Sequence, residues 1–250
     1  VVDELHAITE SKRGDQLFLA ISNIRKYCQN VKIIGLSATV NDPLLIAGWL
    51  APEYDCDIIL SDPGLDPDVS ILKTSEPPPW AGSGGLYSIP EVINEIEKHK
   101  TTLIFHNTRA QAEIFFHNLW LSNSKNLPIA IHHGSLDKDQ RKQVEAAMVK
   151  GDLRAVVCTG SLDLGIDWGS VDLVIQIGAP RQVKRLVQRI GRTNHSHSGV
   201  SKALIVPANR LEVLECFMAL EAIYENKLDS ELQTPIPLDV ICQHLLLVAC

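Results

Sequence analysis

Short apolar segments alternate with longer amphipathic segments through the second half of the chain. The apolar runs are typical of buried strands and cover residues 101–105, 128–133, 154–159, 171–178 and 202–206. The segments with helical spacing cover residues 110–121, 138–149, 182–190 and 211–225. Strands that are apolar on both faces and are joined by helices indicate a parallel, doubly wound α/β sheet, covered on both sides.

The first quarter of the chain repeats this alternation. VVD at residues 1–3 is typical of the end of a strand, and residues 16–26 have helical spacing. VKIIGLSAT at 31–39 predicts a buried strand running into a loop, and CDIIL at 56–60 predicts another strand. Asp42 is placed to cap a helix that ends near Leu50.

Two Pro-rich segments divide the chain. TSEPPPWAGSGG at 74–85 carries three consecutive prolines and three glycines, which exclude a helix or a central strand. We therefore expect a domain over 1–73, a linker over 74–86 and a second domain over 87–228. Residues 229–250 restart after the second break with an amphipathic helix at 238–249.

Composition and charge exclude several classes of protein. The 250 residues are 45% hydrophobic and 21% charged, as in a folded soluble protein, and no apolar run approaches the ~20 residues of a membrane span. A formal net charge of −7 argues against coating nucleic acid by bulk charge, although a local basic groove remains open. None of the six cysteines pairs with another at metal-ligand spacing, which favours buried free thiols in a reducing cytoplasm.

Two polar motifs follow predicted strands in the first domain. In DELH, Asp3 and Glu4 stand where a carboxylate can help to hold Mg²⁺ and a neighbouring one can deprotonate water; the alternative is a pair of exposed acids opening a loop. In GLSAT, Ser37 and Thr39 can relay hydrogen bonds from a nucleotide site, and the alternative is a simple turn.

A basic segment stands out near residue 190. In QRIGRTNH and the residues before it, Arg185, Arg189 and Arg192 are spaced four and three apart and so share one helical face. Guanidinium groups on one face can clamp phosphate oxygens. The alternative is a solvated basic helix face.

Further candidates lie near strand ends. Gly165 and Asp167 precede the 171–178 strand and suit a nucleotide contact, or a simple glycine turn. Thr108, Arg109 and Gly134 offer phosphate donors near helix starts. His132 and His133 are adjacent on a strand and should point to opposite faces, which makes a shared metal improbable.

The order of these motifs carries more information than any one of them. DELH, then SAT, then a strand ending in NTR, then LDLGID and QRIGR, resembles motifs II to VI of superfamily 2 helicases. Over nearly the whole chain the sequence resembles the Lhr (Large helicase-related) family, in its bacterial ligase-associated DEXH-box group. The resemblance implies two RecA-like α/β domains, the first incomplete here, followed by the start of a winged-helix domain.

The resemblance also implies roles for individual residues. Asp3 would hold Mg²⁺ through ATP, Glu4 would be the general base, and His6 would link the γ-phosphate site to the cleft. Ser37 and Thr39 would couple hydrolysis to movement. Arg189 and Arg192 would be arginine fingers, with the nucleotide contacted by the residues Gln188, Gly165 and Asp167. The strand-backbone contacts would be made by the residues Thr108, Arg109, Gly134 and Thr159.

The function implied is an ATP-dependent 3′-to-5′ DNA helicase or translocase of DNA repair, acting on single-stranded DNA, a duplex or a fork. An ATP-dependent DNA ligase and a phosphoesterase nuclease would be companions by family association. Two alternatives stay open: an RNA-directed helicase of the same superfamily, and a RecA-like module without turnover.

One motif of the family is absent from the sequence. No GxxxxGK[ST] phosphate-binding loop occurs in the 250 residues, and the chain begins directly at motif II without a methionine. We therefore expect a fragment of a longer helicase that neither binds ATP tightly nor hydrolyses it alone.

Overall fold

The structure is a computed structural model in which two units are described separately. It describes residues 1–9, 11–28, 30–37, 42–52, 55–60, 65–163, 171–193, 199–225, 227 and 237–249, without the side chains of His6 and Ala7. The first unit comprises residues 1–62 and 229–250, and the second comprises residues 63–228. Among the described residues, no helix is both long and apolar enough to cross a membrane.

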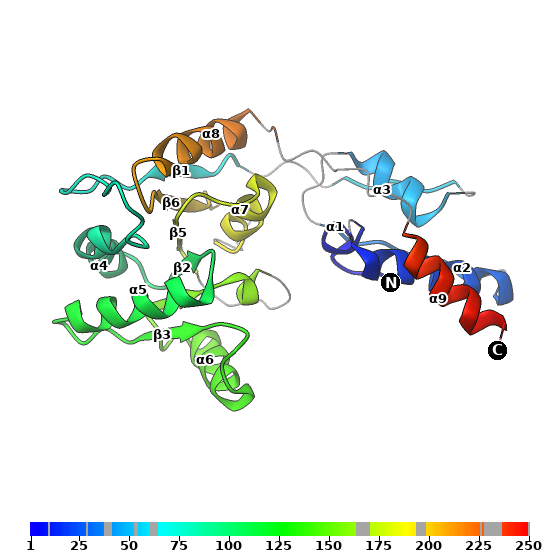
Figure 1. Ribbon diagram of the computed structural model, residues 1–250, viewed down its shortest axis with the longest axis horizontal. Helices are drawn as coiled ribbons and strands as arrows, with labels where there is room; N and C mark the ends of the chain where they lie inside the picture. Colours follow the sequence, from blue (N-terminus) through cyan, green and yellow to red (C-terminus); the bar gives the residue numbers. More distant parts are fainter. Residues whose placement is uncertain are drawn as a thin grey trace. The chain divides into compact units, whose positions relative to one another are not determined.

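The second unit is built on a six-stranded sheet in which every strand pair is parallel (Figure 1). The strand order is β1-β6-β5-β2-β4-β3. The strands are β1 (Asp68–Ile71), β2 (Thr102–His106), β3 (Ile129–His132), β4 (Ala155–Cys158), β5 (Leu173–Ile177) and β6 (Lys202–Val206). The parallel α/β fold that the hydrophobic pattern predicted is therefore confirmed.

Helices cover both faces of this sheet, because neighbouring strand residues alternate between two apolar cores. Leu103 and Phe105 of β2 face one core and Ile104 faces the other. The helices are α4 (Ile89–Lys98), α5 (Arg109–Ser122), α6 (Lys138–Lys150), α7 (Val183–Ile190) and α8 (Glu212–Tyr224), with short 3-10 helices at Leu86–Ser88 and Gly160–Leu162. Helices α4 and α5 pack on one face, and α6, α7 and α8 contribute to the core on the other.

The boundary between the units differs from the expected one. Residues 68–71 were expected in the first domain, but they form β1, which pairs with β6 from Asp68 opposite Lys202 to Ile71 opposite Ile205. The Tyr224 hydroxyl of α8 donates to the Val69 carbonyl at 3.0 Å. The edge strand is thus part of the second unit, and the Pro-rich segment that follows runs between two elements of the same unit.

The first unit contains four helices among its described residues: α1 (Leu5–Ile8), α2 (Lys12–Tyr27), α3 (Pro43–Leu50) and α9 (Leu238–Ala249). Asp42 caps α3 as expected, accepting from the amides of Leu44 and Leu45. Helix α9 contacts α2, where Lys12 pairs with Asp239 and Gln16 donates to Gln243 at 3.2 Å. The α9 segment, expected to begin a winged-helix domain, therefore packs here with the first unit.

Strand structure in the first unit is less extensive than expected. Within the part of this unit that the structure describes, the strand pairing is a single parallel bridge between Val2 and Gly35. The strand expected at residues 56–60 is not formed, and the Ile59 side chain there is 93% exposed. A strand needs a partner for its backbone groups, and no described segment pairs with this one.

Candidate functional site

The carboxyl ends of four neighbouring strands place most of the predicted contact residues at one edge of the second unit's sheet. Strand β2 lies between β5 and β4, and β3 lies beside β4. Phe105 of β2 and His132 of β3 both pair in register with Cys158 of β4. Thr108, Gly134 and Thr159 follow these strand ends within a few residues, so they share the edge at which parallel sheets bind ligands. We call it the carboxyl edge.

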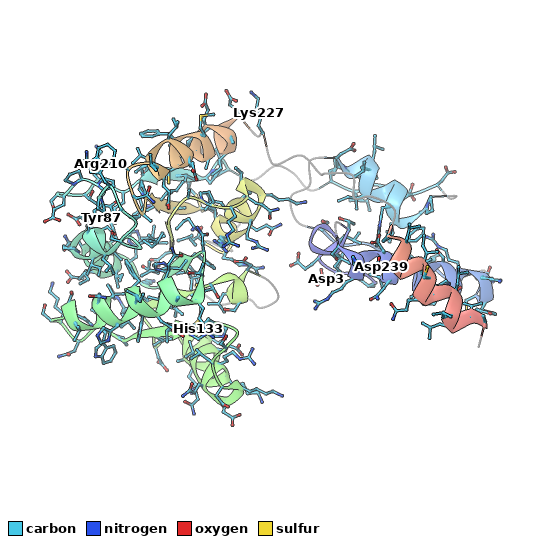
Figure 2. All side chains as sticks on the ribbon, in the orientation of Figure 1. Asp3, Tyr87, His133, Arg210, Lys227 and Asp239 are labelled. Atoms are coloured by element: carbon cyan, nitrogen blue, oxygen red, sulfur yellow. The ribbon has the colours of Figure 1, made fainter. Side chains whose placement is uncertain are left out.

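Thr108 and Arg109 begin helix α5. The Thr108 hydroxyl accepts from the Gln111 amide at 3.3 Å, which makes Thr108 the helix cap. Arg109 is exposed, and its Nε lies 3.6 Å from Glu113 Oε1. The same carboxylate oxygen lies 3.2 Å from Nε2 of the buried His133 (labelled in Figure 2). Glu113 therefore links β3 to the exposed arginine.

The two adjacent histidines face different elements, as their position on a strand predicted. His132 is buried, with Nδ1 at 2.9 Å from Ser161 Oγ and Nε2 at 3.2 Å from Glu145. Burial lowers the pKa of His132, and Glu145 opposes that shift. His133 contacts Glu113 of α5, so the two histidines connect α6 and α5 to the end of β3.

Gly134 and Thr159 differ in their surroundings. Gly134 is exposed, and a Cβ at this position would meet open space, so no close backbone approach inside the unit requires glycine there. Thr159 is partly buried, and its amide donates to the His132 carbonyl at 3.4 Å.

A cluster of charged and amide groups around the buried Asp163 lies beneath the carboxyl edge. Arg189 Nε donates to Asp163 Oδ1 at 2.8 Å, and Arg189 Nη2 donates to Oδ2 at 3.2 Å. Arg189 Nη1 donates to Gln176 Oε1 at 2.6 Å, and the guanidinium carbon lies 4.6 Å from the Phe105 ring centroid. Two further arginines join Asp163: Arg185 Nε at 3.3 Å from Oδ2, and Arg192 Nη2 donating to the main-chain carbonyl at 2.6 Å. We call Asp163, Gln176, Arg185, Arg189 and Arg192 the Asp163 clamp.

The Asp163 clamp bears on the two residues expected to be arginine fingers, Arg189 and Arg192. Arg189 is only 4% exposed, and all three of its nitrogens donate to neighbours inside the unit. To reach a ligand outside, its guanidinium would have to leave a buried carboxylate, which is energetically costly. This geometry does not fit a finger role for Arg189. Arg192 is only partly buried and carries one described hydrogen bond, so a finger role there stays a prediction.

Sequence reasoning did not single out Asp163, Gln176 or Phe105. A signal for Gln176 is present, because it is the lone uncharged polar side chain inside the apolar run LVIQI, and buried polar groups need partners. Its amide nitrogen also donates to the carbonyls of Ile177 and Gly178. Nothing in the sequence shows that Asp163 joins the arginines.

In the first unit, the DELH motif directly follows the Val2 bridge and contains a residue with an unusual backbone conformation. Glu4 has φ 53° and ψ 45°, the left-handed region that few residues other than glycine adopt. Its amide donates to Asp3 Oδ1 at 2.9 Å, and the Asp3 side chain is exposed. Ser37 is exposed two residues after the bridge. The His6 side chain and the residues Thr39, Gly165 and Asp167 lie outside the described part of the chain.

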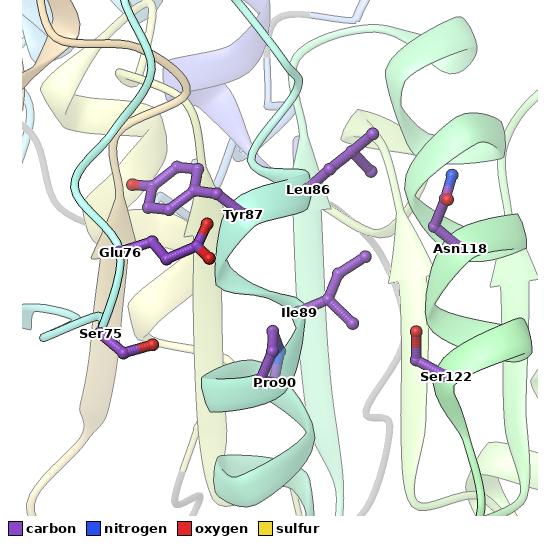
Figure 3. Close-up of a pocket in the computed structure, with 8 residues that line it drawn as sticks. All are labelled: Ser75, Glu76, Leu86, Tyr87, Ile89, Pro90, Asn118 and Ser122. Atoms are coloured by element: carbon purple, nitrogen blue, oxygen red, sulfur yellow. The ribbon is translucent and has the colours of Figure 1, made fainter.

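A cavity in the second unit away from the carboxyl edge is chemically unsuited to a nucleotide. It has a volume of about 330 Å³ and lies between residues 75–76, the start of α4 and the second half of α5 (Figure 3). Among its lining residues only Glu76 carries a charge, and that charge is negative. A phosphate group would meet no cation there.

Comparisons with known proteins agree with these motifs. Residues 86–197 match the family model described as Helicase conserved C-terminal domain. The chain is 39% identical over 98% of its length to the ATP-dependent helicase Lhr-Core protein 2 of Thermococcus barophilus, of which it covers 30%. It is 30% identical over its whole length to the Lhr helicase/uracil glycosylase of Escherichia coli, of which it covers 19%.

A solved structure matches as well. The Mycobacterium smegmatis helicase Lhr, bound to single-stranded DNA and AMP-PNP, superposes with a TM-score of 0.88 at 32% identity. The match covers 98% of this chain and 33% of that one. The chain therefore spans a third or less of the length of these relatives.

Proposed function

Because the chain belongs to the Lhr family of superfamily 2 helicases, we propose that it supplies part of the motor of an ATP-dependent DNA helicase or translocase. The observation that carries the proposal is the match over 98% of the chain to a relative bound to single-stranded DNA and AMP-PNP. The proposal includes action on single-stranded DNA, a duplex or a fork, 3′-to-5′ movement, a role in DNA repair and a cytoplasmic location in a bacterium.

The acidic motif fits the binding of Mg²⁺ together with ATP. Asp3 is an exposed carboxylate directly after the Val2 bridge, and Mg²⁺ prefers one or two such oxygens combined with nucleotide phosphates. No group of three or more His, Cys, Asp or Glu side chains that could hold a metal alone exists among the described residues. The ion would neutralise charge on the phosphates, and Asp3 is the residue that would hold it.

Glu4 is our candidate for the general base that takes a proton from the attacking water. Left-handed backbone at a non-glycine residue costs free energy and concentrates at functional sites. Glu4 takes this conformation directly after Asp3, the proposed Mg²⁺ ligand. This supports separate roles, in which Asp3 holds the ion and Glu4 receives the proton.

The carboxyl edge of the second unit would contact the strand. Arg109 is exposed there, while Thr108 and Thr159 are held by the cap of α5 and the end of β4. Contacts to phosphate carry no sequence information, so binding should be weakly sequence-dependent and should weaken with salt.

The test uses the full-length protein that contains this chain. ATP hydrolysis is measured with no nucleic acid, with single-stranded DNA and with RNA of matched length. We expect DNA to stimulate hydrolysis, and Glu4→Gln to abolish it while AMP-PNP binding persists. If only RNA stimulates hydrolysis, the protein is an RNA-directed helicase and not a DNA helicase. If ATP is hydrolysed under none of the three conditions, the proposal of an ATP-dependent motor is refuted.

The ligase and nuclease companions are the last part of the proposal. They follow from the ligase-associated group that the sequence resembles. The test is affinity purification of the full-length protein from its own cells. We expect an ATP-dependent DNA ligase and a phosphoesterase nuclease to co-purify with it, and recovery of neither protein would refute this part.

A further inference from the structure

A small second cavity opens at the carboxyl edge of the second unit, above the Asp163 clamp. It has a volume of about 50 Å³. Its lining comes from the ends of β2 and β5, the residue after Thr159 and the start of α7, and includes His106, Gly160, Arg181, Gln182, Arg185 and Arg189. We call it the arginine pocket.

The pocket lies where the strand order reverses. From β2 the chain proceeds to β3 and β4 on one side of the sheet, and then to β5 and β6 on the other side of β2. Loops leaving β2 and β5 therefore diverge, and they leave a crevice outside the carboxyl ends of the strands. Such crevices are the usual ligand sites of open parallel sheets.

The charge around the pocket is predominantly positive. Three arginines line it, and the carboxylate of Asp163 pairs with two of them, Arg185 and Arg189. Arg185 is still 52% exposed, and Arg181 is exposed without an ion-pair or hydrogen-bond partner among the described residues. Helix α7 is preceded by its N-cap residue Gln182, whose side chain makes no capping hydrogen bond. Backbone amides at an uncapped helix start favour an anion.

His106 lines the pocket as well, but its ring packs against Phe115 of α5, with the ring centroids 4.8 Å apart. His106 is 1% exposed, and its Nε2 makes no hydrogen bond within the described part of the chain. Burial lowers the pKa of His106 to about 3, so the ring is neutral at physiological pH and the positive charge comes from the arginines.

The size of the pocket limits the ligand. A volume of about 50 Å³ is about four times the ~10–15 Å³ that one water needs. One tetrahedral oxyanion therefore fits this space.

We propose that the arginine pocket binds one phosphate group, with Arg181 and Arg185 as its principal ligands. The phosphate could belong to the backbone of a nucleic-acid strand or to the end of a nucleotide, because the recognising chemistry is the same. The pocket itself stands independently of the proposed function, and only the assignment of its ligand to a strand rests on that function.

The first experiment titrates the 250-residue chain with inorganic phosphate, followed by the amide resonances of Gly160 and Gln182. The variant Arg181→Gln/Arg185→Gln should bind about tenfold more weakly, since it removes two charge-assisted donors. The single variant Arg181→Gln, which removes an exposed side chain without a partner among the described residues, should weaken binding by about threefold without a folding defect. Lys100→Gln/Lys202→Gln removes two charges at the opposite edge and should stay within twofold of the wild type. Equal affinities in all four proteins, or shifts confined to other residues, would overturn the proposal.

The second experiment identifies the source of the phosphate in the full-length protein. Oligo(dT) binding without nucleotide and AMP-PNP binding without DNA are measured for the wild type and the double arginine variant. Loss of oligo(dT) affinity with a salt slope about 0.7 smaller supports a strand phosphate, and loss confined to AMP-PNP supports a nucleotide phosphate. Unchanged affinity for both ligands would overturn the proposal. If the wild type binds neither oligo(dT) nor AMP-PNP, the proposed function is refuted. The titration with inorganic phosphate would then still show whether the arginine pocket binds phosphate.

Discussion

Arg189 and Asp163 form a two-point ion pair inside the second unit, with donor–acceptor distances of 2.8 and 3.2 Å. A residue that the sequence suggested as a ligand of ATP is thus part of the interior. The same aspartate holds Arg192 through its main-chain carbonyl. Arg189 therefore fixes the loop on which the remaining candidate finger depends.

We predict that Asp163→Ala destabilises the second unit by about 3–5 kcal/mol, because it leaves the buried Arg189 guanidinium without a counter-charge. Hydrogen exchange of the β2 amides measures the opening free energy of this unit. The exposed Asp152→Ala provides a matched control and should change it by less than about 0.5 kcal/mol. Equal effects of the two substitutions would show that the ion pair does not stabilise the unit.

We predict that Arg192→Gln in the full-length protein lowers kcat for ATP hydrolysis by about 10³-fold or more, as expected for an arginine finger. DNA binding should stay within about threefold of the wild type. Arg210→Gln removes an arginine that stacks on Trp80 at 4.6 Å, outside the site, and should leave kcat unchanged. A kcat for Arg192→Gln within tenfold of the wild type would exclude the finger role.

Acid should destabilise the second unit through His106. The pKa of His106 is about 3 in the folded state because the ring is buried, whereas an unfolded histidine has a pKa of about 6.5. Between these values the unfolded chain binds the extra proton, so stability is lost as the pH falls below about 6.5, by up to about 1.4 kcal/mol per pH unit. The loss should continue until the pH approaches 3.

His106→Leu should remove this contribution, while the lowered pKa of His132 acts in the same direction in both proteins. The measurement is the opening free energy from hydrogen exchange at pH 6.5 and pH 5. The wild type should lose about 2 kcal/mol more than the variant over this interval. Parallel pH profiles would show that the ring is protonated, or absent from the core, in the folded state.

We predict that the amides of the second unit exchange far more slowly than those of the first in the isolated 250-residue chain. Strands β2, β4 and β5 are fully buried, whereas strand pairing in the described first unit is one bridge. Hydrogen exchange with mass spectrometry should show protection within residues 63–228 and rapid exchange at 55–60. Uniform protection across both units would contradict this.

We also predict that the isolated chain shows no DNA-stimulated ATP hydrolysis above background. The 250 residues contain no GxxxxGK[ST] loop to hold the phosphates. The full-length protein serves as the positive control. Measurable stimulated turnover by the chain alone would require another nucleotide site.

The elements of the second unit were predictable because its buried strands are continuous apolar runs. The predicted strand 202–206 and helix 238–249 coincide with β6 and α9. Strand β1 was missed because DVSI is short and half polar, and only its pairing with β6 identifies it. The strand expected at 56–60 failed for the opposite reason, since an apolar run alone supplies no hydrogen-bonding neighbour.

The candidate site was predictable by position but not by role. Parallel strands made it possible to expect Thr108, Gly134 and Thr159 at one edge. Helical spacing also placed Arg185, Arg189 and Arg192 on one face, but spacing cannot tell which guanidinium is buried. That depends on Asp163 and Gln176, which reach Arg189 from distant segments.

The pairing of β1 with β6 also determines where the protein can be divided. A cut at residue 73 would strip the sheet of its outermost strand and leave the backbone of Lys202–Val206 open to other chains, which is a common route to aggregation. A cut near residue 62 keeps β1 in the chain, so β6 remains paired. Anyone who wants the helicase C-terminal module as a separate, well-behaved sample should begin it ahead of Asp68.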